Sequence, residues 1–137
     1  MEQAASTETP ESWAKRVFAV TLFTDDLAVS TRFYRDILEM PVLNEDATSC
    51  AFRFPGGILI NVVTLAATHD LIEPAPVGGA GTPARMMLTL EVGDVDAVHE
   101  RLSGRGVHFL NGPMDRPWGP RTATFADPSG HCLELSS

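Results

Sequence analysis

The stretch PWGPRTATFADPSGHCLEL, residues 117–135, decides the fold that we predict for this chain. Its centre, the Asp-Pro-Ser-Gly segment at residues 127–130, favours a tight turn, because proline presets φ and glycine accepts a positive φ. The flanking segments RTATFA and HCLEL have the alternation of strands. We therefore predict a terminal hairpin. In its last strand Glu134 points to the opposite sheet face from Leu133 and Leu135.

Composition predicts a single globular domain of ordinary size and excludes several classes of partner. The chain has 137 residues, 44% of them hydrophobic, and a net charge of −8. This charge disfavours binding to nucleic acid or to an anionic membrane. There is no membrane-spanning run and no signal-peptide pattern, and residues 1–15 are predicted to form a disordered polar tail. Cys50 and Cys132 are too few for a disulfide framework, so we expect a cytoplasmic protein.

The first half is predicted to contain a strand, a helix and three further strands. Residues 16–24, RVFAVTLFT, are rich in β-branched and aromatic residues. Asp25 and Asp26 offer an N-cap to a helix at residues 27–40, which Pro41 ends. The following strands are predicted at residues 42–45, 48–54 and 58–65, so the first module spans residues 16–65.

The second half repeats this order after a connector at residues 66–84, which contains several Pro and Gly residues. We predict a strand at residues 85–92, a helix at residues 94–105 capped by Asp94, and a short strand at residues 107–110. A loop at residues 111–119 and the terminal hairpin complete a second module at residues 85–137. Eight main strands are expected in all.

The two halves also align residue by residue, which indicates an internal repeat. FAVTLFTDDL at residues 18–27 aligns with MMLTLEVGDV at residues 86–95, and residues 57–62 align with residues 130–135. In this alignment Ala19 corresponds to Met87, and Asn61 corresponds to Glu134. We therefore expect these four positions to be related by pseudo-symmetry, with Asn61 near Glu134.

The chain resembles the vicinal oxygen chelate superfamily, which includes glyoxalase I, bleomycin-resistance proteins, fosfomycin-resistance enzymes and extradiol dioxygenases. The resemblance covers residues 16–136 and is carried by the Arg-Phe-Tyr-Arg-Asp segment at residues 32–36, the Pro-Trp-Gly loop at residues 117–119 and the terminal turn. It implies an α+β fold in which two tandem βαβββ modules form curled mixed sheets around a cavity. It also implies a homodimer.

In metal-using members of the superfamily, the first and last strands of each module supply four ligands. The resemblance places these positions at Ala19, Asn61, Met87 and Glu134. Only Glu134 is a good ligand for a divalent ion, since alanine has no donor and a thioether is soft. A catalytic zinc site normally has three protein ligands. We therefore predict no metal site and expect no cofactor, with a divalent ion as the less favoured alternative.

The four histidines do not form a metal motif. His99, His108 and His131 are interpreted as surface or loop residues, and His69 is the best candidate to reach the cavity if the connector folds over it. Strand alternation predicts cavity walls that are largely apolar. Trp118 and Arg121 are candidates to stack on or orient a ligand, although packing and ion pairing explain them as well. The predicted wall residues are Ala19, Thr21, Phe23, Leu59, Asn61, Val63, Met87, Thr89, Glu91, Cys132 and Glu134.

Two functional hypotheses follow from different classes. In the first, the protein binds a small organic molecule without a metal, in the manner of bleomycin-resistance proteins. In the second, it is a lyase, isomerase or dioxygenase-type enzyme of the same superfamily that uses Glu134 as acid, base or residual metal ligand. In both, the partners are a small molecule and a second copy of the chain. The predicted ligand-binding set is Ala19, Thr21, Asn61, Met87, Thr89, Trp118, Arg121 and Glu134.

Overall fold

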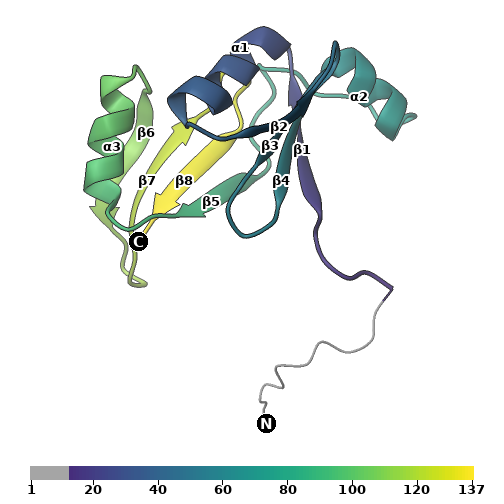
Figure 1. Ribbon diagram of the computed structural model, residues 1–137. Coiled ribbons are helices and arrows are strands. Elements are labelled where there is room, and N and C mark those ends of the chain that lie inside the picture. The colour runs from purple at the N-terminus through teal and green to yellow at the C-terminus, as the bar shows by residue number, and fades with distance from the viewer. Residues whose placement is uncertain (1–12) are drawn as a thin grey trace.

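The computed structural model describes residues 13–137, so most of the predicted tail lies outside the described residues. Two four-stranded mixed sheets lie side by side in Figure 1. The first has the order β1-β4-β3-β2 and the second the order β5-β8-β7-β6, with the parallel pair at the corresponding edge of each sheet. The strands are β1 Ala19–Thr24, β2 Val42–Glu45, β3 Ser49–Arg53, β4 Leu59–Thr64, β5 Met87–Glu91, β6 Phe109–Asp115, β7 Arg121–Ala126 and β8 Cys132–Ser136.

The α+β fold of two βαβββ modules is confirmed, and the helix caps follow the sequence signals. The carboxylate of Asp26 accepts a hydrogen bond from the Val29 amide at the start of α1 (Leu27–Arg32). Asp94 does the same for Ala97 at the start of α3 (Val95–Gly104). Each carboxylate satisfies an amide that the helix leaves without an internal acceptor.

Three elements differ from the prediction. The helix expected at residues 27–40 is α1 followed by a π-helical turn, η1 (Phe33–Ile37), and Glu39 then adopts a positive φ of 61°. The connector contains a helix, α2 (Leu65–Ile72), whose first turn is capped by the Thr64 hydroxyl. Its run of Leu and Ala favours a helix, and the segment was missed because the later Pro and Gly residues dominate its composition.

The third difference is β6, which continues to Asp115 through the segment predicted as a loop. Its pairing with β7 has two irregularities, and the second, between Asn111 and Met114, accommodates Gly112 and Pro113. A Cβ at Gly112 would lie 2.4 Å from the Thr122 carbonyl oxygen, so only glycine allows the two backbones to approach this closely. The strand tolerates Pro113 because β6 is at the edge of its sheet.

The core lies where η1 contacts both sheets. Tyr34 packs on Phe52 of β3 with ring centroids 5.6 Å apart, and Phe33 packs on Phe125 of β7 at 6.2 Å. All four side chains are buried. Burial of one such ring stabilises a fold by about 1.5–3 kcal/mol. Because adjacent residues of one helical turn reach different sheets, this contact fixes the two modules relative to each other.

Candidate functional site

The pairing register places the predicted site residues in two equivalent rows. In the first sheet Ala19 lies opposite Leu59, and Thr21 lies opposite Asn61. In the second sheet Met87 lies opposite Cys132, and Thr89 lies opposite Glu134. The Thr21 and Asn61 pair therefore corresponds to the Thr89 and Glu134 pair, as the sequence repeat indicated.

Glu134 finds its partner within its own sheet. The Thr89 hydroxyl donates a hydrogen bond of 3.0 Å to Oε1 of Glu134. The expected neighbour, Asn61, lies in the other sheet, because each row is built from the parallel strand pair of one module. The carboxylate is half-buried. The hydrogen-bond partner of Glu134 is thus a neutral hydroxyl. No cationic side chain of residues 13–137 forms an ion pair with this carboxylate.

The side chains of Arg121 and Trp118 make their contacts with residues outside these two rows. Nε and Nη2 of Arg121 donate to the Asp96 carboxylate at 2.7 and 2.9 Å, and Nη1 donates to Asp115 at 3.0 Å. These hydrogen bonds, first those to Asp96, raise the pKa of Arg121 above its usual range. Trp118 is 72% exposed in the loop between β6 and β7, with the Arg116 guanidinium 5.8 Å from its ring centroid.

The donor set does not fit the metal site of the metal-using relatives implied by the sequence. Ala19 and Met87 offer no hard donor, and of the other two positions only Glu134 carries an anionic oxygen donor, since Asn61 has a neutral amide. In the part of the chain that the structure describes, one cluster brings three His, Cys, Asp or Glu side chains within reach of an ion. It consists of His69, Asp70 and Glu73. These side chains are exposed on and just after α2, and exposed groups of this kind are ordinary surface chemistry.

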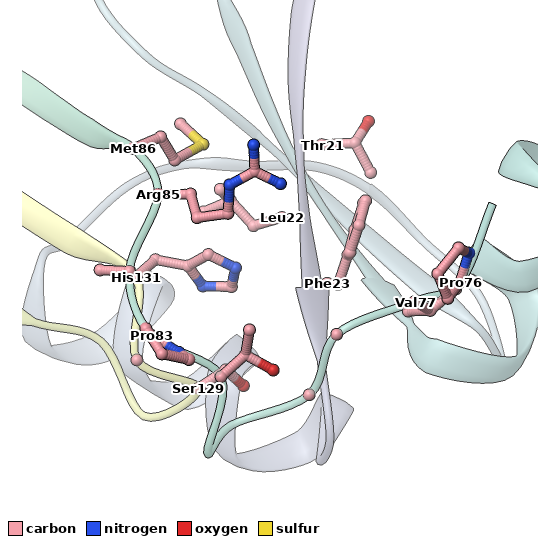
Figure 2. A pocket seen from close by; sticks show the side chains of 15 residues that line it. Thr21, Leu22, Phe23, Pro76, Val77, Pro83, Arg85, Met86, Ser129 and His131 are labelled. Atoms are coloured by element: carbon pink, nitrogen blue, oxygen red, sulfur yellow. The ribbon is translucent and has the colours of Figure 1, made fainter.

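A cavity of about 470 Å³ lies between β1, the connector and the turn before β8. Figure 2 shows its side chains, with Phe23 on one side and Met86, Arg85 and His131 on the other. Its surface is mainly apolar, and its polar groups come from a few residues, as in many small-molecule sites. The lining residues are Thr21, Leu22, Phe23, Pro76, Val77, Gly78, Gly79, Thr82, Pro83, Ala84, Arg85, Met86, Ser129, Gly130 and His131.

Of the predicted ligand-binding residues, the cavity includes Thr21. Asn61 is next to it across the β1–β4 pairing, whereas Met87 directly follows the lining residue Met86. The connector does fold over the cavity, but through residues 76–79 and 82–84 rather than through His69. The Asp25 carboxylate at the end of β1 helps to hold it there, since it accepts a 2.8 Å hydrogen bond from the Ala80 amide.

The sequence interpretation missed a buried polar network under the terminal turn. Asp127 is 6% exposed and accepts hydrogen bonds from the Tyr34 hydroxyl at 2.7 Å and from the amides of Ser129 and His131. Nδ1 of His131 lies 2.9 Å from Oδ2 of the same carboxylate. The Ser129 hydroxyl also lies 3.0 Å from that of Thr24, which ties the turn to β1.

The network fixes the charge state of Asp127. Burial by itself would raise the pKa of this carboxyl, but the hydrogen bonds from His131 and Tyr34 outweigh it and hold the pKa below the usual range. Burial and the neighbouring Asp127 charge raise the pKa of Tyr34, so its hydroxyl stays protonated as a donor. The spacing of four residues between Asp127 and His131, across a predicted turn, was the available sequence signal for this contact.

The sequence pattern of the Glyoxalase/Bleomycin resistance protein/Dioxygenase superfamily matches residues 16–135. The chain belongs to this superfamily. Protein YraH of Bacillus subtilis is 26% identical over 123 residues, which cover 88% of this chain and 96% of YraH. No helix within residues 13–137 of this superfamily member is long and apolar enough to cross a membrane.

Solved structures of other proteins share the fold. A glyoxalase/bleomycin resistance protein/dioxygenase from Nocardioides is 23% identical, with a TM-score of 0.77 over 93% of this chain and 85% of that one. An antibiotic binding protein from Streptomyces is 24% identical, with a TM-score of 0.71 over 92% and 98% of the two chains. At these identities the likeness establishes the fold alone.

Proposed function

We propose that this protein binds a small organic molecule in the cavity between β1, the connector and the terminal turn, without a metal ion. The observation that carries the proposal is the cavity itself, whose volume of about 470 Å³ suits a small organic ligand. Its apolar walls favour burial of a hydrocarbon or aromatic body, and its few polar groups orient it. One relative of the same fold binds an antibiotic, which is consistent with this use.

The test is a thermal-shift screen of small aromatic and heterocyclic compounds, followed by calorimetry on the compounds that stabilise the protein. Ala84→Trp should abolish binding, because the new ring would occupy the cavity that Ala84 lines. Ala66→Trp, at an exposed position of α2, is the matched control and should bind normally. Equal binding by the two variants would place the ligand elsewhere.

Metal independence is proposed from the donor set, since two of the four ligand positions are Ala19 and Met87. Protein purified without chelators should contain less than a stoichiometric amount of zinc, manganese, iron or nickel by elemental analysis. About one ion per chain, lost in Glu134→Ala, would contradict the proposal and would favour the metal-dependent enzyme.

We also propose that Glu134, which is outside the cavity lining but three residues after the lining residue His131, contacts the ligand. It is a half-buried carboxylate whose partner, Thr89, is neutral. Glu134→Gln should keep the fold and weaken binding by about 1–3 kcal/mol, the usual range for a hydrogen bond to a charged group. Glu100→Gln, at an exposed position of α3, is the control. Equal binding by Glu134→Gln and the unsubstituted protein would make Glu134 a structural residue.

A homodimer is proposed as the assembly. The second sheet leaves Met87 48% exposed on β5 and Leu110 56% exposed on β6, and Trp118 is exposed nearby in sequence. A second chain covering these apolar side chains would remove them from water. Sedimentation at micromolar concentration should give a dimer, and Met87→Lys should weaken it while Leu71→Lys, on α2, should not. A monomer for the unsubstituted protein would refute the proposal.

A further inference from the structure

His131 turns one ring nitrogen, Nδ1, to Asp127 and leaves the other, Nε2, for the cavity. The buried Asp127 carboxylate is ionised and can only accept hydrogen bonds, so the Nδ1 atom that faces it must carry a proton. In the neutral imidazole the lone pair is then on Nε2. Figure 2 shows the ring extending into the cavity, and no group of residues 13–137 donates a hydrogen bond to Nε2.

Arg85 supplies a positive charge to the same cavity. It forms no ion pair with the described residues, and none of the lining residues is an Asp or a Glu. The charged groups around His131 are thus Asp127 in its own turn and Arg85 just before β5. The Tyr34 hydroxyl of η1 donates to Oδ2 of Asp127, the same oxygen that lies 2.9 Å from Nδ1 of His131. β1 contributes Thr21, Leu22 and Phe23, which are uncharged.

This arrangement suits a ligand that can lose a proton. We propose that His131, positioned by Asp127, accepts the proton of a weakly acidic hydroxyl group, a phenol or an enol, on a molecule bound in the cavity, and that Arg85 stabilises the resulting oxyanion. The ligand O–H bond breaks, an Nε2–H bond forms, and the imidazolium is stabilised by the Asp127 carboxylate. No electron is gained or lost, and the proton returns when the ligand leaves.

The chemistry of the walls favours an aromatic ligand of this class. Phe23 and Met86 lie on opposite sides of the space in Figure 2, and both ring and thioether contacts favour a flat aromatic body. A phenol combines such a body with an acidic hydroxyl. The inference rests on the proposed binding function and adds to it the class of ligand and the residue that recognises it.

The experiment uses 7-hydroxycoumarin as the probe, because its phenol and phenolate forms differ in absorption. At a pH where the free dye is mainly the phenol, the complex should show the phenolate spectrum. His131→Asn should remove this spectrum from the bound dye and weaken binding by roughly ten- to a hundredfold, as expected for the loss of a charged hydrogen bond. Arg85→Met should change the spectrum and the affinity in the same direction.

Two controls isolate the proton transfer. The probe 7-methoxycoumarin has no acidic proton, so the unsubstituted protein and His131→Asn should bind it within about twofold of each other. His108→Asn replaces an exposed histidine outside the cavity and should leave the phenolate spectrum of bound 7-hydroxycoumarin unchanged.

The outcomes separate this inference from the proposed function. If the protein binds 7-hydroxycoumarin only as the phenol, or binds both coumarins equally well, His131 is not a proton acceptor, although the cavity still binds ligands. If neither coumarin binds while other compounds stabilise the protein through the cavity, the assigned ligand class is wrong. If no compound binds at the cavity in the thermal-shift screen, both proposals are refuted.

Discussion

The turn before β4 and the turn before β8 share the same two backbone hydrogen bonds and differ in their side chains. In the first, the Phe54 amide donates to the Ile58 carbonyl at 3.2 Å and the Gly57 amide donates to Phe54 at 3.4 Å. In the second, the same two bonds join residues 127 with 131 and 130 with 127, at 2.9 and 3.0 Å. Pro-Gly-Gly in one and Pro-Ser-Gly in the other thus support the same two hydrogen bonds, although Gly56 has a φ of 93° and Ser129, at the equivalent position, does not adopt a positive φ.

The difference lies in what each turn buries. Phe54 and Asp127 occupy equivalent positions and are 8% and 6% exposed, but one is an aromatic ring and the other a carboxylate. The first turn therefore has only apolar packing to contribute, whereas the second holds a charged network that reaches Tyr34 and the cavity. The repeat supplied the same hydrogen-bonded turn twice, and the side chains of the second copy carry the candidate chemistry.

The largest effect on stability is expected from Asp127→Ala. The substitution leaves the Tyr34 hydroxyl and two turn amides without their acceptor, and each unsatisfied buried group costs about 1–3 kcal/mol. We expect the free energy of unfolding in urea to fall by about 3 kcal/mol or more. A loss below about 1 kcal/mol would show that water replaces the carboxylate and that the network is not structural.

The two turns should also differ in their response to pH. The pKa of Asp127 is lower in the folded protein than in the unfolded chain, so its stabilising contribution is present above the ordinary aspartate pKa of about 3.9 and is lost as the pH falls through the lower folded value. The stability difference between the unsubstituted protein and Asp127→Ala should therefore shrink below about pH 4.

Phe54→Ala is the control for this pH dependence, because it removes only apolar contacts at the equivalent position. Its effect on unfolding in urea should be the same across that pH range. A parallel decline of both differences would mean that other carboxylates cause the change.

A smaller effect is expected from Tyr34→Phe, which removes the hydroxyl and keeps the ring on Phe52. The loss of one hydrogen bond to a charged acceptor should lower the free energy of unfolding by about 1.5–3 kcal/mol. The pKa of Asp127 should rise toward its ordinary value, which can be followed by NMR titration of its carboxyl carbon. An unchanged pKa would mean that His131 and the turn amides alone hold the carboxylate ionised.

The smallest effects test whether the two backbones are equivalent. Gly57 and Gly130 have φ values of 94° and 95°, and an added Cβ would have no contact under 3.4 Å at either position. Gly57→Ala and Gly130→Ala should each cost about 1 kcal/mol, the penalty for placing a side chain at positive φ. The two losses, measured by urea unfolding, should agree within about 0.5 kcal/mol. A larger cost at one glycine would show that its turn is more constrained than its backbone angles indicate.

The sequence by itself determined the local elements and their order. Pro and Gly at fixed offsets specified the terminal turn, and Asp26 and Asp94 specified the helix starts. Strand alternation and the internal repeat indicated that Asn61 and Glu134 occupy equivalent positions in the two sheets. These features depend on neighbours a few residues apart, or on the internal repeat. The missed α2 and the extended β6 show the limit of such local signals. The Pro and Gly residues of these segments favour a loop, but the first segment begins with a helix and the second pairs with β7.

Only the tertiary structure decided where the cavity lies and which polar groups reach it. Tyr34 and Asp127 are separated by 93 residues, and Thr24 and Ser129 by 105, so no local pattern could bring them together. The same holds for the connector, which the sequence identified as long but which Asp25 helps to hold beside β1. Local preferences are set by backbone geometry, whereas a buried carboxylate and a ligand cavity depend on contacts between surfaces that exist only after the two modules pack.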